Sequence, residues 1–122
     1  MKKDIDIEKL KEEIVERLKP LNPDKIILFG SYAYGTPDED SDIDLYVVTN
    51  DDFIPKNYNE KMEVYLKIAN YIQDFLQEHP TDLIVHTRKM HEKFKVVNNS
   101  FSREILQKGQ LLYEREHNKR LA

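Results

Sequence analysis

Hydrophobic residues recur at steps of three and four positions through the first part of the chain. They are Ile7, Leu10, Ile14, Leu18 and Leu21. This spacing is typical of a helix with one apolar face, and it predicts an amphipathic helix over residues 6 to 19. Asp4 or Asp6 can cap its start, and Pro20 and Pro23 end it.

Three short runs rich in β-branched and aromatic residues predict strands. They cover residues 25–29, 43–48 and 81–86. The first run closes abruptly at Gly30, and the small, polar residues 31–41 turn the chain back toward the second. Residues 110–114 form either a further edge strand or a segment that packs across the sheet.

Between the second and third strands, residues 58–78 keep helical spacing, and this segment is the longest predicted helix. Its inward-facing positions are expected to be Met62, Tyr65, Leu66, Ala69, Ile72, Phe75 and Leu76. Two short helical pieces should follow the third strand. In the second of these we expect Ser100 to cap, Phe101, Ile105 and Leu106 to face inward, and Gly109 to end the turn.

Strands and helices interspersed in this way predict an α+β fold with a single core. At 122 residues the whole chain, 1–122, fits one domain. We expect its core to span about 6–115 and the tail 116–122 to be frayed.

Composition and charge remove several classes of function. The chain has no cysteine, which excludes disulfides and thiolate zinc sites and favours a cytoplasmic protein. Its apolar runs are too short to span a bilayer, so no membrane association is expected. With 19 basic and 23 acidic side chains, the net charge of −4 does not favour binding to long nucleic acids. The four histidines show no metal-ligand spacing.

Two aspartates mark the second predicted strand. Asp42 and Asp44 are two positions apart, so their carboxylates project from the same strand face. Like charges so placed repel, and a cation between them relieves the repulsion. Mg²⁺ suits such a pair, because it is held by one or two carboxylates plus substrate phosphates. A solvated strand edge is the alternative interpretation.

Gly30 and Ser31 lie where the first strand ends and a turn or short helix begins. Glycine lets the backbone approach a ligand closely, and the N–H groups of a helix start together with the Ser31 hydroxyl favour an anionic oxygen. Phosphate beside carboxylate-bound Mg²⁺ indicates a nucleoside triphosphate. Taken alone, Gly-Ser after a strand is more often an ordinary turn.

Asp82 is a third candidate, because it interrupts an otherwise apolar strand and an unpaired buried carboxylate is expensive. It could ligate a second metal ion or take a proton from an attacking hydroxyl, as in-line nucleotidyl transfer requires. The alternative is a turn residue after Pro80. An EF-hand starting at Asp38 is excluded, because position six is Ile43 rather than Gly and position twelve is Thr49 rather than Glu.

The segments Gly30 to Thr36 and Ser41 to Leu45 together resemble the nucleotidyltransferase signature of the DNA polymerase beta superfamily. Over nearly its whole length the chain is similar to the smallest members, the minimal nucleotidyltransferase (MNT) proteins of bacteria and archaea. The resemblance implies a mixed, partly antiparallel sheet flanked by helices. It also implies Mg²⁺, as two ions, held by Asp42, Asp44 and Asp82, and a triphosphate held by Gly30 and Ser31.

Minimal members often pair with a HEPN-domain toxin, and some act as antitoxins that transfer AMP from ATP onto a tyrosine of the toxin. The resemblance therefore implies a Mg²⁺-dependent nucleotidyltransferase with catalytic Asp42, Asp44 and Asp82, ATP as substrate and a HEPN toxin as partner. Many relatives carry arginine where this chain has Tyr34. That departure favours the alternative, a nucleotide-binding antitoxin that neutralises by contact. A small-molecule nucleotidyltransferase is a further alternative.

Overall fold

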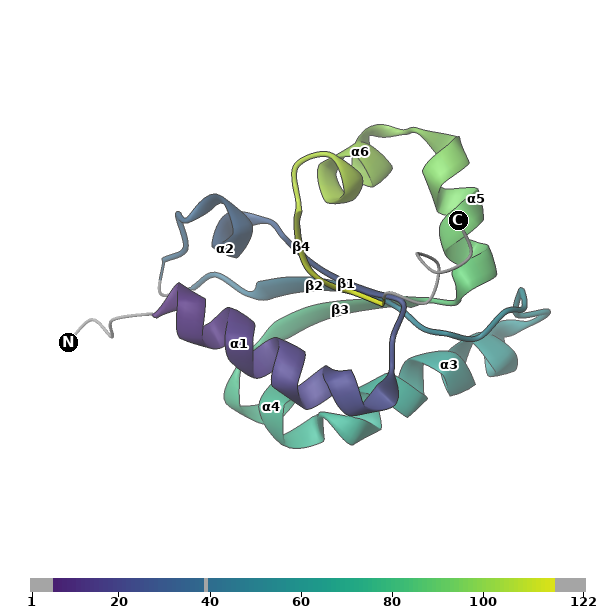
Figure 1. Ribbon diagram of the computed structural model, residues 1–122, viewed down its shortest axis with the longest axis horizontal. Coiled ribbons are helices and arrows are strands. Elements are labelled where there is room, and N and C mark those ends of the chain that lie inside the picture. Colours follow the sequence, from purple (N-terminus) through teal and green to yellow (C-terminus); the bar gives the residue numbers. More distant parts are fainter. Residues whose placement is uncertain (1–5, 39, 116–122) are drawn as a thin grey trace.

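The structure, a computed structural model, describes residues 6–38 and 40–115, so the predicted frayed tail lies outside the described residues. Its centre is a mixed sheet of four strands in the order β3-β2-β1-β4 (Figure 1). The strands are β1 (Lys25–Phe29), β2 (Ile43–Val48), β3 (Thr81–His86) and β4 (Gln110–Glu114). β2 pairs with β3 in parallel, whereas β1 pairs antiparallel with both β2 and β4. The predicted strands are confirmed, with residues 110–114 at an edge.

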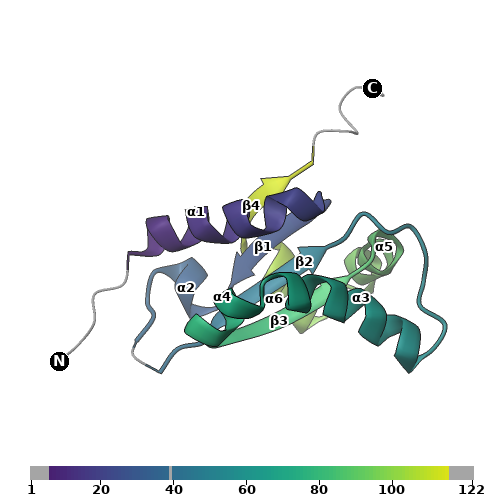
Figure 2. The same cartoon turned by 90° about the horizontal axis from the view of Figure 1, so that it is seen from below.

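Helices cover both faces of this sheet. They are α1 (Ile7–Leu18), the 3₁₀ turn η1 (Lys19–Leu21), α2 (Ser31–Tyr34), α3 (Tyr58–Tyr71), α4 (Gln73–Glu78), α5 (Arg88–Val97) and α6 (Ser100–Leu106). α1, α3 and α4 lie together on one face (Figure 2), and α5 and α6 lie on the other. Within the described ranges, no helix has both the length and the apolar composition needed to cross a membrane.

Alternation along β2 divides the hydrophobic core between the two faces. Ile43, Leu45 and Val47 pack with α1, α3 and α4, whereas Tyr46 and Val48 pack with the α5 and α6 side. All five side chains are 2% exposed or less. Because successive side chains of a strand point to opposite faces, these core residues also fix where the polar residues of the same strand point.

The first helix begins as predicted, with the Asp6 carboxylate accepting a hydrogen bond from the backbone N–H of Lys9 at 3.1 Å. Its end is less abrupt than predicted. The chain continues through Pro20 in η1, where proline occupies a starting position that needs no N–H donor, and then stops at Asn22 in the left-handed conformation.

The prediction of one helix over residues 58–78 is wrong in two respects. The segment breaks at Ile72, whose φ of −111° and ψ of 31° end α3 before α4 begins. Val64 and Ile68 fill the core, while Leu66 is exposed. Ala69, Ile72 and Phe75 are buried as predicted, so the prediction is wrong only in the first half of the segment, where the hydrophobic residues offer more than one apolar stripe.

Two details of α6 also differ from the prediction. Asn99 caps the helix by accepting from the backbone N–H of Ser102 at 2.8 Å, so Ser100 is its first residue rather than its cap. Ile105 is fully buried as expected, but Phe101 is 47% exposed. Phe101 makes edge contacts with the rings of Phe29 and Phe94, at centroid distances of 6.3 and 6.0 Å.

Two histidines are joined by a buried hydroxyl on the α5 and α6 side. The Tyr46 hydroxyl lies 2.9 Å from Nδ1 of His86 and 2.8 Å from Nδ1 of His91. A hydroxyl has one proton, so it donates to one ring and accepts from the other. Burial lowers the pKa of both histidines to about 4, with Lys61 near His86 and Lys25 near His91 adding to the effect.

These lowered values make stability depend on pH. In the unfolded chain a histidine binds its proton near pH 6.5, whereas His86 and His91 in the folded protein stay neutral until about pH 4. The unfolded state therefore binds more protons between these limits, and the free energy of unfolding should fall as pH is lowered through them. Urea unfolding at a series of pH values measures this loss.

The matched comparison is the double variant His86→Gln and His91→Gln. It should be less stable than the wild type at neutral pH, because the tyrosine hydroxyl loses its partners, but its stability should fall less steeply between about pH 6.5 and 4. Parallel pH profiles for the two proteins would show that other groups cause the loss.

Candidate active site

Strand pairing places the predicted carboxylates at one end of the sheet. Asp44 is opposite Asp82 in the parallel pair of β2 and β3, and opposite Phe29 in the antiparallel pair of β1 and β2. Asp44 shares its face of β2 with Tyr46, so its side chain projects on the side of α5 and α6. Asp42 is exposed and lies one residue before β2 begins.

Four carboxylates act on one another at this end. The pKa of Asp44 is raised, first because its side chain is partly buried, and then by the negative charges of Asp82, Asp42 and Glu104. The last of these comes from α6 and was not foreseen. The repulsion predicted for the pair Asp42 and Asp44 is therefore present, and it involves two further carboxylates.

Asp82 differs from its prediction in one respect. Its side chain is exposed, because β3 is an edge strand of the sheet. The expectation that it is a buried and costly carboxylate is wrong. Its place directly across from Asp44 depends on strand register instead.

Gly30 lies against Asp44. Its backbone has φ of 76° and ψ of −159°, a conformation open essentially to glycine alone. A Cβ atom at this position would lie 2.0 Å from Oδ2 of Asp44, so only glycine allows this approach. Ser31 then opens α2, where the first backbone N–H groups have no partner within the helix. The structure thus brings the glycine-serine turn and the carboxylates together.

Tyr34 contacts one of these carboxylates. Its hydroxyl donates a hydrogen bond to Oε2 of Glu104, which joins α2 to α6 and raises the pKa of Tyr34. In the sequence, Tyr34 is singled out only because it departs from the arginine expected from the family resemblance. Its contact with a residue 70 positions away carried no local signal.

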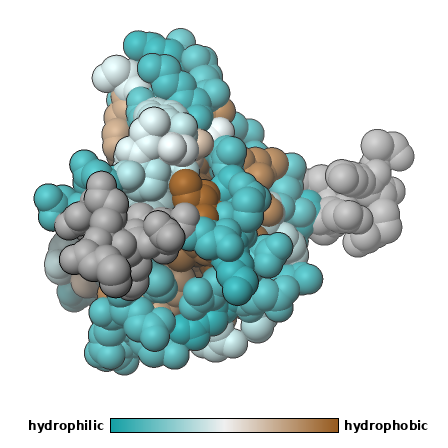
Figure 3. All heavy atoms as spheres, turned by 90° about the vertical axis from the view of Figure 1, so that its left-hand side faces the viewer, coloured by the Kyte–Doolittle hydropathy of each residue, from teal (hydrophilic) through white to brown (hydrophobic). Residues whose placement is uncertain are grey.

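The donor set is the kind that a hard divalent cation prefers, because it consists of carboxylate oxygens and has no nitrogen or sulfur ligand. The oxygens of Asp42, Asp44 and Asp82 do not, however, all lie within 4.8 Å of one another. Among the described residues, the group that meets this distance is Glu13, Glu78 and His79. The end of the molecule that carries α2 is mostly hydrophilic, with a small hydrophobic area near its centre (Figure 3).

Comparisons with known proteins place the chain in a family. A family model described as a nucleotidyltransferase domain matches residues 7–112. A protein of Methanocaldococcus jannaschii that carries the provisional name protein adenylyltransferase is 36% identical over 91 residues, which cover 73% of this chain and 77% of the relative.

Two solved structures share the fold. One is a crystal structure of a toxin–antitoxin with AMP-PNP, which matches with a TM-score of 0.53 and 22% identity over 91% of this chain and 78% of that chain. The other is a provisional nucleotidyltransferase from Sulfolobus solfataricus, with a TM-score of 0.54 and 20% identity over 91% of this chain and 82% of that chain.

The contact between Gly30 and Asp44 generates a prediction. Gly30→Ala should destabilise the fold and displace the carboxylate, because the new methyl group collides with Oδ2 of Asp44 and the backbone is strained. Gly35→Ala is the comparison, since Gly35 has a similar φ of 78° but nothing within 4 Å of its Cβ position. The free energy of unfolding of Gly35→Ala should fall by only about 1–2 kcal/mol, the cost of placing a residue other than glycine in the left-handed conformation.

Chemical denaturation measures both losses. Adding Asp44→Ala to Gly30→Ala should recover the part of the loss caused by the collision, and leave the part caused by backbone strain. If the two changes are strictly additive, the glycine and the carboxylate do not touch.

Proposed function

We propose, from the premise that the chain belongs to the nucleotidyltransferase domain family, that it transfers AMP from ATP to a hydroxyl of another protein. The observation that carries this proposal is the position of Asp44, which lies against the Gly30 backbone and directly across from Asp82. A turn suited to phosphate and a set of carboxylates suited to a divalent cation meet at this point.

The carboxylates would hold Mg²⁺, as one or two ions. Asp42, Asp44 and Asp82 are the proposed ligands. The pKa of Asp44 is raised first by partial burial and then by the neighbouring negative charges. Bound Mg²⁺ would supply positive charge that offsets the repulsion and neutralises the triphosphate.

Gly30 and Ser31 would position the phosphates. The Gly30 backbone lies directly against Oδ2 of Asp44, and the free N–H groups at the start of α2 would donate to phosphate oxygens. Ser31 would add a hydroxyl donor. We assign it a positioning role and not that of a nucleophile, since no histidine or lysine is spaced to activate it.

In the proposed reaction, the acceptor hydroxyl oxygen attacks the α-phosphorus of ATP. A new phosphorus–oxygen bond forms to the acceptor, the bond between the α-phosphorus and the bridging oxygen breaks, and pyrophosphate leaves. The hydroxyl proton passes to a carboxylate, for which Asp82 is the candidate because its exposed position is open to a large acceptor.

The proposed acceptor is a tyrosine of a HEPN-domain toxin, with this chain as the antitoxin. Support comes from the curated relative named as a protein adenylyltransferase and from the shared fold of the antitoxin structure with AMP-PNP. The exposed site also favours a macromolecular acceptor, because small-molecule sites are generally enclosed.

One observation favours a second candidate, an antitoxin that acts by contact alone. Tyr34 occupies the position of the arginine that many relatives carry, and its hydroxyl is engaged with Glu104. Tyrosine supplies a neutral donor in place of a cation, so the site has less positive charge for binding a triphosphate.

The first test concerns binding. Asp42→Asn and Asp44→Asn should each abolish or severely weaken Mg²⁺-dependent ATP binding, measured by calorimetry. Without metal, Asp44→Asn should be more stable than the wild type, because a raised carboxylate pKa means that its negative charge destabilises the fold. Asp52→Asn, an exposed aspartate in the loop after β2, is the control and should bind normally. Unchanged binding in both site variants would overturn the assignment.

The second test separates transfer from contact. Asp82→Asn should leave folding and partner binding intact, yet lower AMP transfer by roughly two or more orders of magnitude, the usual scale for general acid–base groups. Each protein is mixed with the toxin, ATP and Mg²⁺, and intact mass reports the added AMP. Full neutralisation of the toxin by the wild type without any adduct would instead support the contact-only antitoxin.

A further inference from the structure

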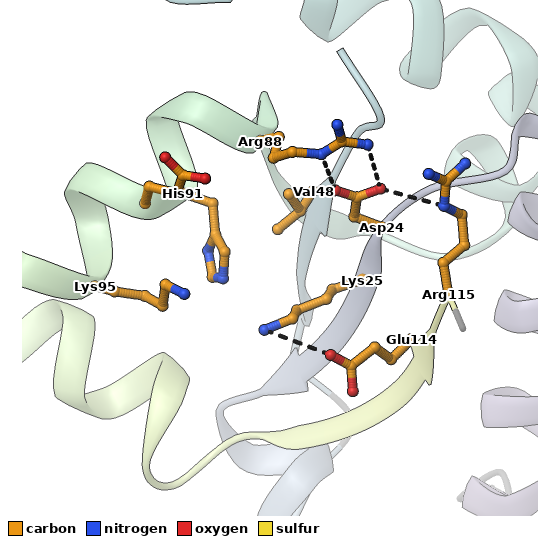
Figure 4. Close-up of a pocket in the computed structure, with 9 residues that line it drawn as sticks. Asp24, Lys25, Val48, Arg88, His91, Lys95, Glu114 and Arg115 are labelled. Atoms are coloured by element: carbon orange, nitrogen blue, oxygen red, sulfur yellow. Dashed lines mark hydrogen bonds and ion pairs between the residues drawn. The ribbon is translucent and has the colours of Figure 1, made fainter. Parts of the chain in front are cut away.

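A pocket lies at the opposite end of the sheet from Asp44. Its volume is about 340 Å³, and its walls come from the start of β1, the ends of β2 and β4, and one side of α5 (Figure 4). β1 runs between the two ends, because Phe29 at its finish pairs with Asp44 and Lys25 at its start lines the pocket. The pocket is therefore separate from the candidate active site.

Asp24 organises one wall of this pocket. Its carboxylate is 9% exposed and accepts hydrogen bonds from Nε of Arg88 at 2.6 Å and from Nη2 of Arg88 at 3.1 Å. The Nε atom of Arg115 lies 3.4 Å from the same carboxylate. One buried anion thus holds the guanidinium group of Arg88 and lies close to that of Arg115.

The facing wall carries two lysines. Lys25 forms a long ion pair with Glu114 at 3.8 Å, and Lys95 from α5 has no hydrogen-bond or ion-pair partner in the described part of the chain. Among the described residues of the lining, there are four cationic side chains and three carboxylates, whereas the whole chain has a net charge of −4. Lys25 and Lys95 are the cations whose pairing within the described residues is weak or absent, and they supply the positive charge for an anion.

His91 gives the pocket an unsatisfied polar atom. The side chain is 5% exposed, its Nδ1 is engaged with the Tyr46 hydroxyl, and its Nε2 is buried without a hydrogen-bond partner. Figure 4 shows the ring pointing from α5 into the space between Lys25 and Lys95. A buried polar group without a partner destabilises the protein by about 1–3 kcal/mol, so a ligand that supplies the partner is favoured.

The tautomer that suits an anion is available to His91. When the Tyr46 hydroxyl donates to Nδ1 of His91 and accepts from Nδ1 of His86, Nε2 of His91 carries the proton and is a donor. With its pKa lowered to about 4, His91 is neutral at pH 7 and keeps this arrangement. The lysine chains beside it are flexible enough to admit an oxygen atom to Nε2.

We propose that this pocket binds a small anion bearing a phosphate group, held by Lys25, Lys95 and Nε2 of His91. Phosphate matches the lining because it offers several acceptor oxygens to ammonium, guanidinium and imidazole donors at once. The volume lies at the lower limit of small-molecule sites, which suits inorganic phosphate or a nucleoside monophosphate. This site is independent of the proposed transfer reaction.

Ring-nitrogen NMR of the full chain with ¹⁵N-labelled histidine tests the proposal. Inorganic phosphate, without Mg²⁺, should shift the Nε2 signal of His91 and saturate with a dissociation constant on the order of 1 mM or tighter. AMP is titrated in parallel. Tighter binding of AMP identifies a nucleoside monophosphate as the ligand, whereas equal affinity identifies the phosphate group alone.

Matched lysine variants on α5 make the test specific. Lys95→Gln should weaken phosphate binding roughly tenfold, the effect of one charge-assisted hydrogen bond. Lys93→Gln changes a lysine of the same helix that does not line the pocket, and it should bind as the wild type does. Asp44→Asn should also bind normally, which separates this site from the nucleotide site.

Three outcomes would overturn the proposal. The first is no saturable shift at His91, which leaves the pocket to water. The second is an equal shift with chloride at matched ionic strength, which indicates general screening and no site. The third is equal weakening by Lys93→Gln and Lys95→Gln, which indicates an effect of net charge alone.

Discussion

The register of β2 against both neighbouring strands is the constraint on which the candidate site depends. Ile43, Leu45 and Val47 are almost fully buried on one face, and each such side chain contributes about 1.5–3 kcal/mol through burial. A slip of one residue would move all three to the face covered by α5 and α6 and turn Asp44 toward the opposite face. The apolar residues of β2 therefore hold Asp44 between the Gly30 backbone and Asp82.

This arrangement has an electrostatic cost in the absence of a cation. The pKa of Asp44 is raised because the carboxylate is partly buried beside three other negative charges. One of these, Glu104, is engaged by the Tyr34 hydroxyl, which fixes its position without neutralising it. Because tyrosine is neutral, this contact adds no positive charge to the site. The proposed Mg²⁺ would therefore have to balance both the carboxylates and the negative charge of a triphosphate.

Local patterns predicted the strands and the Gly30 turn, because alternation and turn chemistry are properties of neighbouring residues. What they could not provide was the neighbour across the sheet. Asp82 was taken as buried because its strand is apolar, but β3 lies at an edge, and strand order is decided by packing over the whole chain. The same limit applies to the Tyr34–Glu104 contact and to the break at Ile72, which depend on how distant helices meet the sheet.

One face of β2 links the two ends of the molecule. Asp44 and Tyr46 are adjacent positions on that face, and Tyr46 holds His91 at the cationic pocket. Proximity of this kind does not by itself couple two sites, because coupling requires an element with two arrangements that both ligands bias. β2 is paired on both sides, and its side chains beyond Asp44 are nearly all buried, which opposes a second arrangement of this strand. The proposed anion site is therefore independent of the proposed transfer reaction and does not regulate it.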